Sequence, residues 1–100
     1  SVVRPTFSML GNYTISDFVI QQLIKKMITE NIEIQRVKSV VINQLPDGVQ
    51  INVEVVMFYS AYMKQTLRQI QEKVVEDLEN ITALFVVELN IRIAGLAKRA

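Results

Sequence analysis

The residue types that carry most nucleophilic, acid–base and metal chemistry are scarce in this chain. Its 100 residues include neither cysteine nor histidine. Their absence removes the usual zinc ligands, the commonest general base and any thiolate nucleophile. Serines and threonines are present, but they have no histidine to activate them. We therefore predict that the protein is not an enzyme and has no catalytic residues and no cofactor.

The charged residues with the most distinctive spacing lie in residues 60–80, which have the periodicity of an amphipathic helix. The first half of this segment is basic, with Lys64 and Arg68, and the second half is acidic, with Glu72, Glu76, Asp77 and Glu79. This order opposes the helix macrodipole, which favours acidic groups at the start of a helix and basic groups at its end. Two possible i,i+4 ion pairs, Arg68–Glu72 and Lys73–Asp77, offset only about 0.2–0.5 kcal/mol each.

Two interpretations of this pattern stay open. The helix face is either an ordinary solvated surface or an assembly surface whose acidic end meets a basic patch on a neighbour, such as Lys25-Lys26 or Lys98-Arg99. A head-to-tail contact of this kind can propagate. The predicted interaction surface comprises Lys64, Arg68, Glu72, Glu76, Asp77 and Glu79, together with Asn90 and Arg92 on the following strand.

The carboxylates of Glu72, Glu76 and Glu79 share one helical face and are candidate ligands for a divalent cation. Exposed carboxylates on a single helix are usually solvated, and no convergent ligand is apparent elsewhere in the sequence. We therefore predict no metal site.

The overall charge does not point to nucleic acid, because 11 basic and 10 acidic side chains leave a net charge of +1. RNA-recognition modules do share the element order expected below, so an RNA-binding module of ferredoxin-like topology is one alternative. Such modules stack bases on aromatic side chains of the exposed sheet face. Here the outward positions are polar or acidic: Gln50, Asn52, Glu54, Glu88 and Asn90. A small-ligand regulatory domain is a second alternative, with Tyr13, Tyr59 and Tyr62 as candidate pocket residues, although no glycine-rich loop supports it.

Two amphipathic helices are expected. Ser16 is a suitable N-cap for a helix that ends near Glu30, with a capping box of Thr14 and Asp17 as the alternative start, and Ser60 is a suitable N-cap for a helix that ends near Asn80. The apolar stripe of the first helix comprises Phe18, Val19, Leu23, Ile24, Met27 and Ile28. That of the second comprises Met63, Leu67, Ile70, Val74, Leu78 and Ile81.

Three strands are expected with them. Residues 32–44 form a strand with a bulge or a late start near Gln35-Arg36, and Pro46-Asp47-Gly48 turns it into a second, antiparallel strand. That second strand directs Val49, Ile51, Val53, Val55 and Met57 to one face. In the last strand, alternation directs Phe85, Val87, Leu89, Ile91 and Ile93 to the core.

These elements predict an α+β fold: a small mixed sheet of three to four strands with two helices on one face, in the order (β)αββαβ. The uncertain first strand covers residues 12–15. We expect one domain over residues 1–100, with a weakly patterned lead-in at residues 1–11.

The second helix and last strand carry a resemblance to a known family. The stretch IQEKVVEDLENITAL followed by VVELNIRIAG, and NYTISDFVI near the start, resemble the alkaline-shock envelope proteins of Gram-positive bacteria. Gln71, Glu79, Thr82 and Asn90 discriminate most, since the other matched positions are apolar in any such fold. The chain departs from the family at Ala83, where glycine is usual, at Ser60-Ala61-Tyr62, and at NIEIQRVKSV after the first helix.

The resemblance implies a non-enzymatic envelope-stress protein that self-associates. It also implies a cytoplasmic location, peripheral at the inner face of the cell membrane, where a small membrane-anchoring partner holds the protein. A divergent member or a related domain fits the departures.

Overall fold

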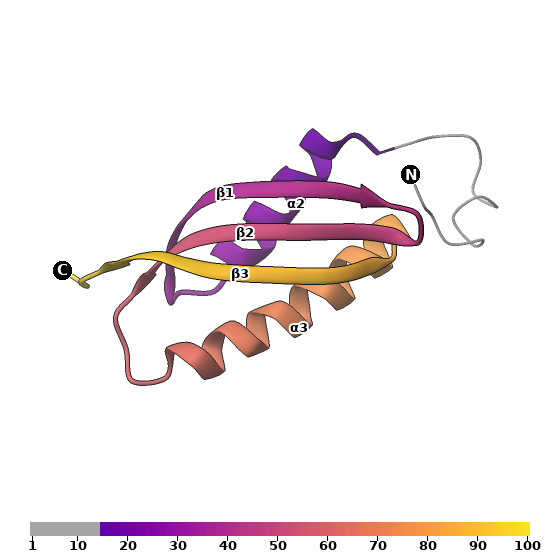
Figure 1. Cartoon of the computed structure of the whole chain (residues 1–100). Coiled ribbons are helices and arrows are strands. Elements are labelled where there is room, and N and C mark those ends of the chain that lie inside the picture. The colour runs from indigo at the N-terminus through magenta and orange to yellow at the C-terminus, as the bar shows by residue number, and fades with distance from the viewer. Residues whose placement is uncertain (1–14) are drawn as a thin grey trace.

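The computed structural model describes residues 15–100. Its elements follow in the order α2 (Asp17–Thr29), β1 (Ile34–Leu45), β2 (Gly48–Phe58), α3 (Met63–Thr82) and β3 (Val86–Ala97) (Figure 1). This αββαβ order confirms the predicted α+β fold. The weakly patterned lead-in lies outside the described residues, and so does the uncertain first strand except for Ile15.

The strands form one mixed sheet in the order β1-β2-β3. β1 and β2 make the predicted antiparallel hairpin, in which Leu45 lies opposite Gly48, so that Gly48 belongs to β2 rather than to the turn. β3 runs parallel to β2 and is reached through α3. Both helices cover the same face of the sheet, and within residues 15–100 no helix covers the other, open face (Figure 1).

The core lies between the helices and the central strand β2. The predicted inward residues of β2, Val49 to Met57 at alternate positions, are each at most 1% exposed. Rows of residues spaced by four cover them: Ile20, Ile24 and Ile28 from α2, and Ile70, Val74 and Leu78 from α3. Because β2 is buried beneath two helices and flanked by two strands, it holds the other elements in position.

The start of α2 differs from its predicted stripe. Ser16 is the N-cap as predicted, and its Oγ accepts a hydrogen bond from the Val19 N–H at 3.2 Å. However, Phe18 and Val19 are 66% and 46% exposed, and Ile20 is buried instead. Successive helical residues rotate by about 100°. Once the isoleucine row faces the sheet, the two residues before Ile20 therefore point away from it.

The start of α3 also differs from the prediction. The N-cap is Tyr62, and Ser60 lies in the preceding turn, where its Oγ accepts the Tyr62 N–H at 3.2 Å. A serine hydroxyl stabilises such a turn as readily as a helix start. At the other end Ile81 is 61% exposed, and the buried row continues to Thr82, which is fully buried.

β1 and β3 are irregular in different ways. β1 starts late and carries register shifts between Ile34 and Arg36 and between Val37 and Ser39, which confirms the predicted bulge. β3 carries a shift that was not predicted, because Val86 pairs with Val49 whereas Glu88 pairs with Gln50. The extra residue makes the prediction wrong for Phe85 and Val87, which are 40% and 41% exposed, while Val86 is buried.

Candidate functional site

Three polar residues join α3 to β3. The Gln71 amide donates to the Leu89 carbonyl at 3.1 Å, and the Glu79 carboxylate accepts the Val86 N–H at 2.8 Å. The hydroxyl of Thr82 donates to the Leu78 carbonyl at 2.6 Å and accepts the Leu84 N–H at 3.2 Å. We call Gln71, Glu79 and Thr82 the α3–β3 joint. Of the four residues that discriminate the family resemblance, Gln71 and Glu79 therefore hold β3 against α3, and Thr82 fixes the connection between them.

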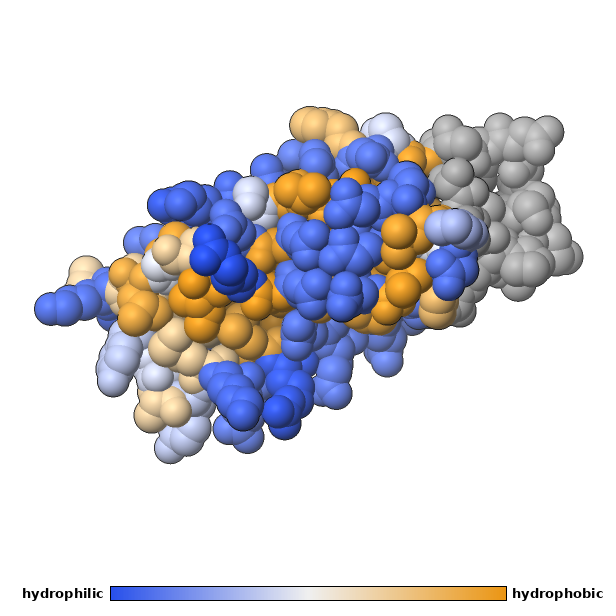
Figure 2. Space-filling view, viewed as in Figure 1, coloured by the Kyte–Doolittle hydropathy of each residue, from blue (hydrophilic) through white to orange (hydrophobic). Residues whose placement is uncertain are grey.

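The fourth, Asn90, belongs to a network of amides on the open face of the sheet. Asn90 Nδ2 donates to Asn52 Oδ1 at 3.2 Å, and Asn52 and Gln50 exchange hydrogen bonds of 2.8 and 3.1 Å. Asn43 and Glu88 extend the network on either side of Gln50, at 2.8 and 3.3 Å. Figure 2 shows the resulting hydrophilic band across the middle of this face.

An ion pair lies next to the amide network. Arg92 pairs with Glu54, which also accepts a hydrogen bond from the Ser39 hydroxyl at 3.3 Å. The hydrogen bond and positive charge of Arg92 lower the pKa of the Glu54 carboxyl. The three cross-strand rows through Gln50, Asn52 and Glu54 hold no aromatic side chain on which a base would stack.

The charged residues of α3 lie on two sides of the helix. Glu72, Glu76 and Glu79 line a groove between α3 and β3, together with Val75 and Leu89. Lys64 and Arg68 flank a hollow beside Tyr62 at the start of the helix.

Asp77 lies apart from these residues, on the side of α3 that faces α2. It accepts a hydrogen bond from Lys73 Nζ at 2.9 Å, and this contact raises the pKa of Lys73. The structure thus distributes the eight predicted interaction residues over four places: the groove between α3 and β3, the hollow at the start of α3, the α2 side of α3, and the open face of the sheet.

The charges are segregated along the long axis of the molecule, whose Cα atoms extend over 47 × 20 × 20 Å. α3 runs antiparallel to β3, so its basic start lies beside the end of β3, where Lys98 and Arg99 follow (Figure 1). Its acidic end lies beside the start of β3 and the β1–β2 turn. We call the first region, which contains Lys64, Arg68, Lys98 and Arg99, the basic end of the molecule. The second region, which contains Glu76 and Glu79, is the acidic end.

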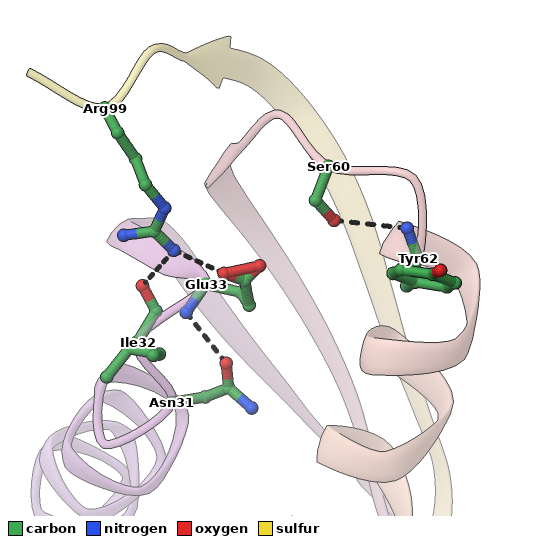
Figure 3. Close-up of polar contacts among 6 residues, drawn as sticks. All are labelled: Asn31, Ile32, Glu33, Ser60, Tyr62 and Arg99. Atoms are coloured by element: carbon green, nitrogen blue, oxygen red, sulfur yellow. Dashed lines mark hydrogen bonds and ion pairs between the residues drawn. The ribbon is translucent and has the colours of Figure 1, made fainter.

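The basic end contains a cluster that the sequence did not reveal. The Arg99 guanidinium lies 4.5 Å from the centre of the Phe58 ring, donates to the Ile32 carbonyl at 3.1 Å and pairs with Glu33. Figure 3 shows Arg99 reaching across to the turn before β1, with Ser60 and Tyr62 on the neighbouring loop. Four large apolar or aromatic side chains at this end are exposed: Ile32 (78%), Tyr59 (72%), Tyr62 (69%) and Leu96 (56%). They come from three separate segments, so no local sequence pattern identifies them as a group.

Two further observations concern metals and membranes. Within residues 15–100, no cluster of three or more metal-ligating side chains is placed to hold an ion. None of the helices in this part of the chain is long and apolar enough to cross a membrane.

Solved structures share the fold. The C-terminal domain of the magnetosome protein MamB from Desulfamplus magnetovallimortis BW-1 superposes with a TM-score of 0.61 and 13% identity, covering 85% of this chain and 100% of that domain. Two variants of the MamM C-terminal domain give TM-scores of 0.57 and 0.56 at 11% and 12% identity. They cover 83% of this chain and 93% and 95% of their own. At these identities the likeness shows the fold alone.

The sequence itself matches a family model, although no curated protein matches it. The model is that of the alkaline shock protein 23 family, described as having a cell envelope-related function, and it matches residues 20–98. The match covers α2 from Ile20 onward, α3 and all three strands, including the α3–β3 joint. It confirms the resemblance drawn from Gln71, Glu79, Thr82 and Asn90. The chain belongs to the alkaline shock protein 23 family, whose function is related to the cell envelope.

Proposed function

We propose that the chain is a non-enzymatic assembly module of the cell envelope, which self-associates and docks to a membrane-anchoring partner. The family's cell envelope-related function supports the proposed location of the module at the cell envelope. The observation that carries the proposal is the segregation of charge between the two ends of an elongated molecule.

Four charged residues on the surface of α3 support self-association because they find no partner of opposite charge within the described part of one copy of the protein. Lys64 lies in the first turn of α3, at the positive end of the helix dipole, whereas Arg68, Glu72 and Glu76 lie in the body of the helix, outside its first and last turns. None of these four side chains forms an ion pair with another described residue, and all four are exposed. An arrangement that is mildly destabilising in a monomer becomes favourable when each half meets the opposite charge on another copy.

The long axis defines how copies would meet. The acidic groove between α3 and β3 lies near one end, and the basic end lies at the other. A head-to-tail contact between them leaves a free acidic groove and a free basic end on the assembly, so further copies can be added. In such an assembly, copies of the protein would follow one another along the long axis of the molecule.

Sedimentation velocity at increasing salt tests the proposal. We expect assemblies at low ionic strength that dissociate as salt rises, because exposed charges are screened beyond about 10 Å at roughly 0.1 M salt. Glu72→Lys with Glu76→Lys should leave the protein monomeric at low salt. Asp77→Lys is the matched control, since Asp77 faces α2, and it should assemble normally. Assembly that is insensitive both to salt and to the double reversal would contradict the proposal.

A further inference from the structure

We infer that the basic end is a contact surface for an anionic lipid bilayer, which the domain touches directly through Ile32, Tyr59, Tyr62 and Leu96. This inference goes beyond the proposed function, because it needs neither self-association nor an anchoring partner.

The apolar groups at this end are more exposed than a monomer in water requires. All four are more than half exposed, and they lie around the tip of the molecule, on the α2–β1 turn, the β2–α3 loop and the end of β3. Exposed apolar groups gathered in one place indicate a contact surface. Tyrosine suits the boundary of a bilayer in particular, because its ring is apolar and its hydroxyl prefers water.

The charges around these groups determine which surface fits. Exposed basic side chains at this end are Arg36, Lys64, Arg68 and Lys98. The acidic side chains nearby are Glu30 and Glu33, and Glu33 is already paired with Arg99. Basic groups around an apolar tip complement a bilayer that contains anionic lipids, since each such group near the surface contributes roughly a fivefold gain in affinity.

The tip is held in place by the fold. The Phe58 N–H donates to the Glu33 carbonyl at 2.9 Å, and the Tyr59 N–H donates to the Ala97 carbonyl at 3.0 Å. Arg99 bridges the Ile32 carbonyl, Glu33 and the Phe58 ring (Figure 3). Because these contacts fix the three segments relative to one another, little conformational entropy is lost when the tip meets a surface.

The segregation of charge also determines the orientation. With the basic end on an anionic bilayer, the acidic end is directed away from it by repulsion. The domain would then stand with its long axis toward the bilayer. The acidic groove between α3 and β3 would remain accessible to other proteins.

Co-sedimentation with vesicles tests the inference on the purified chain without any partner. We expect binding to vesicles of phosphatidylglycerol and phosphatidylcholine in equal parts, little binding to phosphatidylcholine alone, and release from the mixed vesicles as salt rises. Tyr59→Ser with Leu96→Ser should weaken binding about tenfold or more through lost apolar contact. Lys64→Glu with Lys98→Glu should weaken it at least as much.

Phe18→Ser with Ile81→Ser is the matched control, because both side chains are about as exposed (66% and 61%) but lie away from the basic end. This variant should bind like the unchanged chain, and circular dichroism verifies that every variant is folded. Equal binding to both vesicle types, or no binding to either, overturns the inference, and the second result leaves the tip to a protein partner. Sedimentation velocity without vesicles shows separately whether self-association survives, so the two proposals can fail independently.

Discussion

At the residue scale, the backbone of Ala83, where the chain departs from the family pattern, has a conformation that favours glycine. It ends α3 with φ of 59° and ψ of 12°, and its N–H donates to the Glu79 carbonyl at 2.8 Å. A residue with a Cβ atom is disfavoured in this left-handed conformation, and glycine is not. Glycine, which the family resemblance leads us to expect at this position, would adopt the conformation without that cost. The chain keeps the geometry without the residue that suits it best.

Ala83→Gly should therefore stabilise the protein. Relief of the left-handed conformation is worth about 1–2 kcal/mol, and the greater freedom of glycine in the unfolded chain offsets about 0.5–1 kcal/mol of it. We expect a net increase of about 0.5–1 kcal/mol in the free energy of unfolding, measured by urea denaturation. Ala94→Gly, in a β3 residue with negative φ, should destabilise the protein. A decrease in the free energy of unfolding for Ala83→Gly would show that the left-handed conformation of Ala83 costs less than the added freedom of glycine in the unfolded chain.

The Glu54–Arg92 pair leads to a pH dependence. Arg92 lowers the pKa of Glu54 in the folded protein below its ordinary value of 4.5. A depressed carboxyl pKa stabilises the fold at pH values above the unfolded pKa, and that contribution disappears as the pH falls through the folded pKa. The thermal stability of Arg92→Ala should thus be lower than that of the unchanged chain at pH 7, and the two should converge in acid. A difference in melting temperature that stays constant from pH 7 to below the folded pKa of Glu54 argues against this account.

At the element scale, the start of β3 depends on one close approach. A Cβ atom added to Gly48 would lie 2.4 Å from the Phe85 carbonyl oxygen and 2.9 Å from a methyl group of Val87. The same carbonyl accepts the Val49 N–H at 2.9 Å. The β1–β2 turn and the α3–β3 connection therefore meet backbone to backbone, and the bulge at Val87 lies where they meet.

Gly48→Ala should separate these two segments and lower the free energy of unfolding by about 2 kcal/mol or more, because the atoms in the way belong to the backbone. Gly95→Ala is the matched control. Its added Cβ would meet Val56 at 3.6 Å, an ordinary contact, and its effect should be small. Chemical denaturation of both variants measures the difference in their free energies of unfolding. Equal values would mean that the α3–β3 connection can move away from the added Cβ atom at little cost.

Helices and strands were largely predictable because each buries one regular face. The period of two in β2 and the period near 3.6 in both helices follow directly from burial against a single core. The errors lie at element ends and irregularities. Phe18, Ile81 and Phe85 lie within or next to regular elements, but the end of a helix or a bulge turns them away from the core.

At the scale of the whole molecule, antiparallel packing of α3 against β3 produces the charge segregation. The basic start and acidic end of α3 would otherwise affect only the charge distribution along this one helix. Placed beside a strand whose end is followed by Lys98 and Arg99, it gives the molecule two ends of opposite charge. Head-to-tail assembly and an oriented bilayer contact both follow from this one arrangement, and the two proposed experiments separate them.

The sequence by itself determined the α+β class, the order of the elements, the family and the charged stripe on α3. Each of these depends on composition, periodicity or local spacing, which are properties of neighbouring residues. Only the tertiary structure decided that Gln71, Glu79 and Thr82 hold β3 and its connection to α3, that Asp77 lies apart from the other acidic residues, and that Ile32, Tyr59 and Leu96 lie at the same end of the molecule. The physical reason is that packing around β2 decides which side of α3 faces β3 and which faces α2, and it brings together segments as distant as those of Ile32 and Arg99, 67 positions apart. Their proximity arises from packing around β2 and leaves no local pattern in the chain.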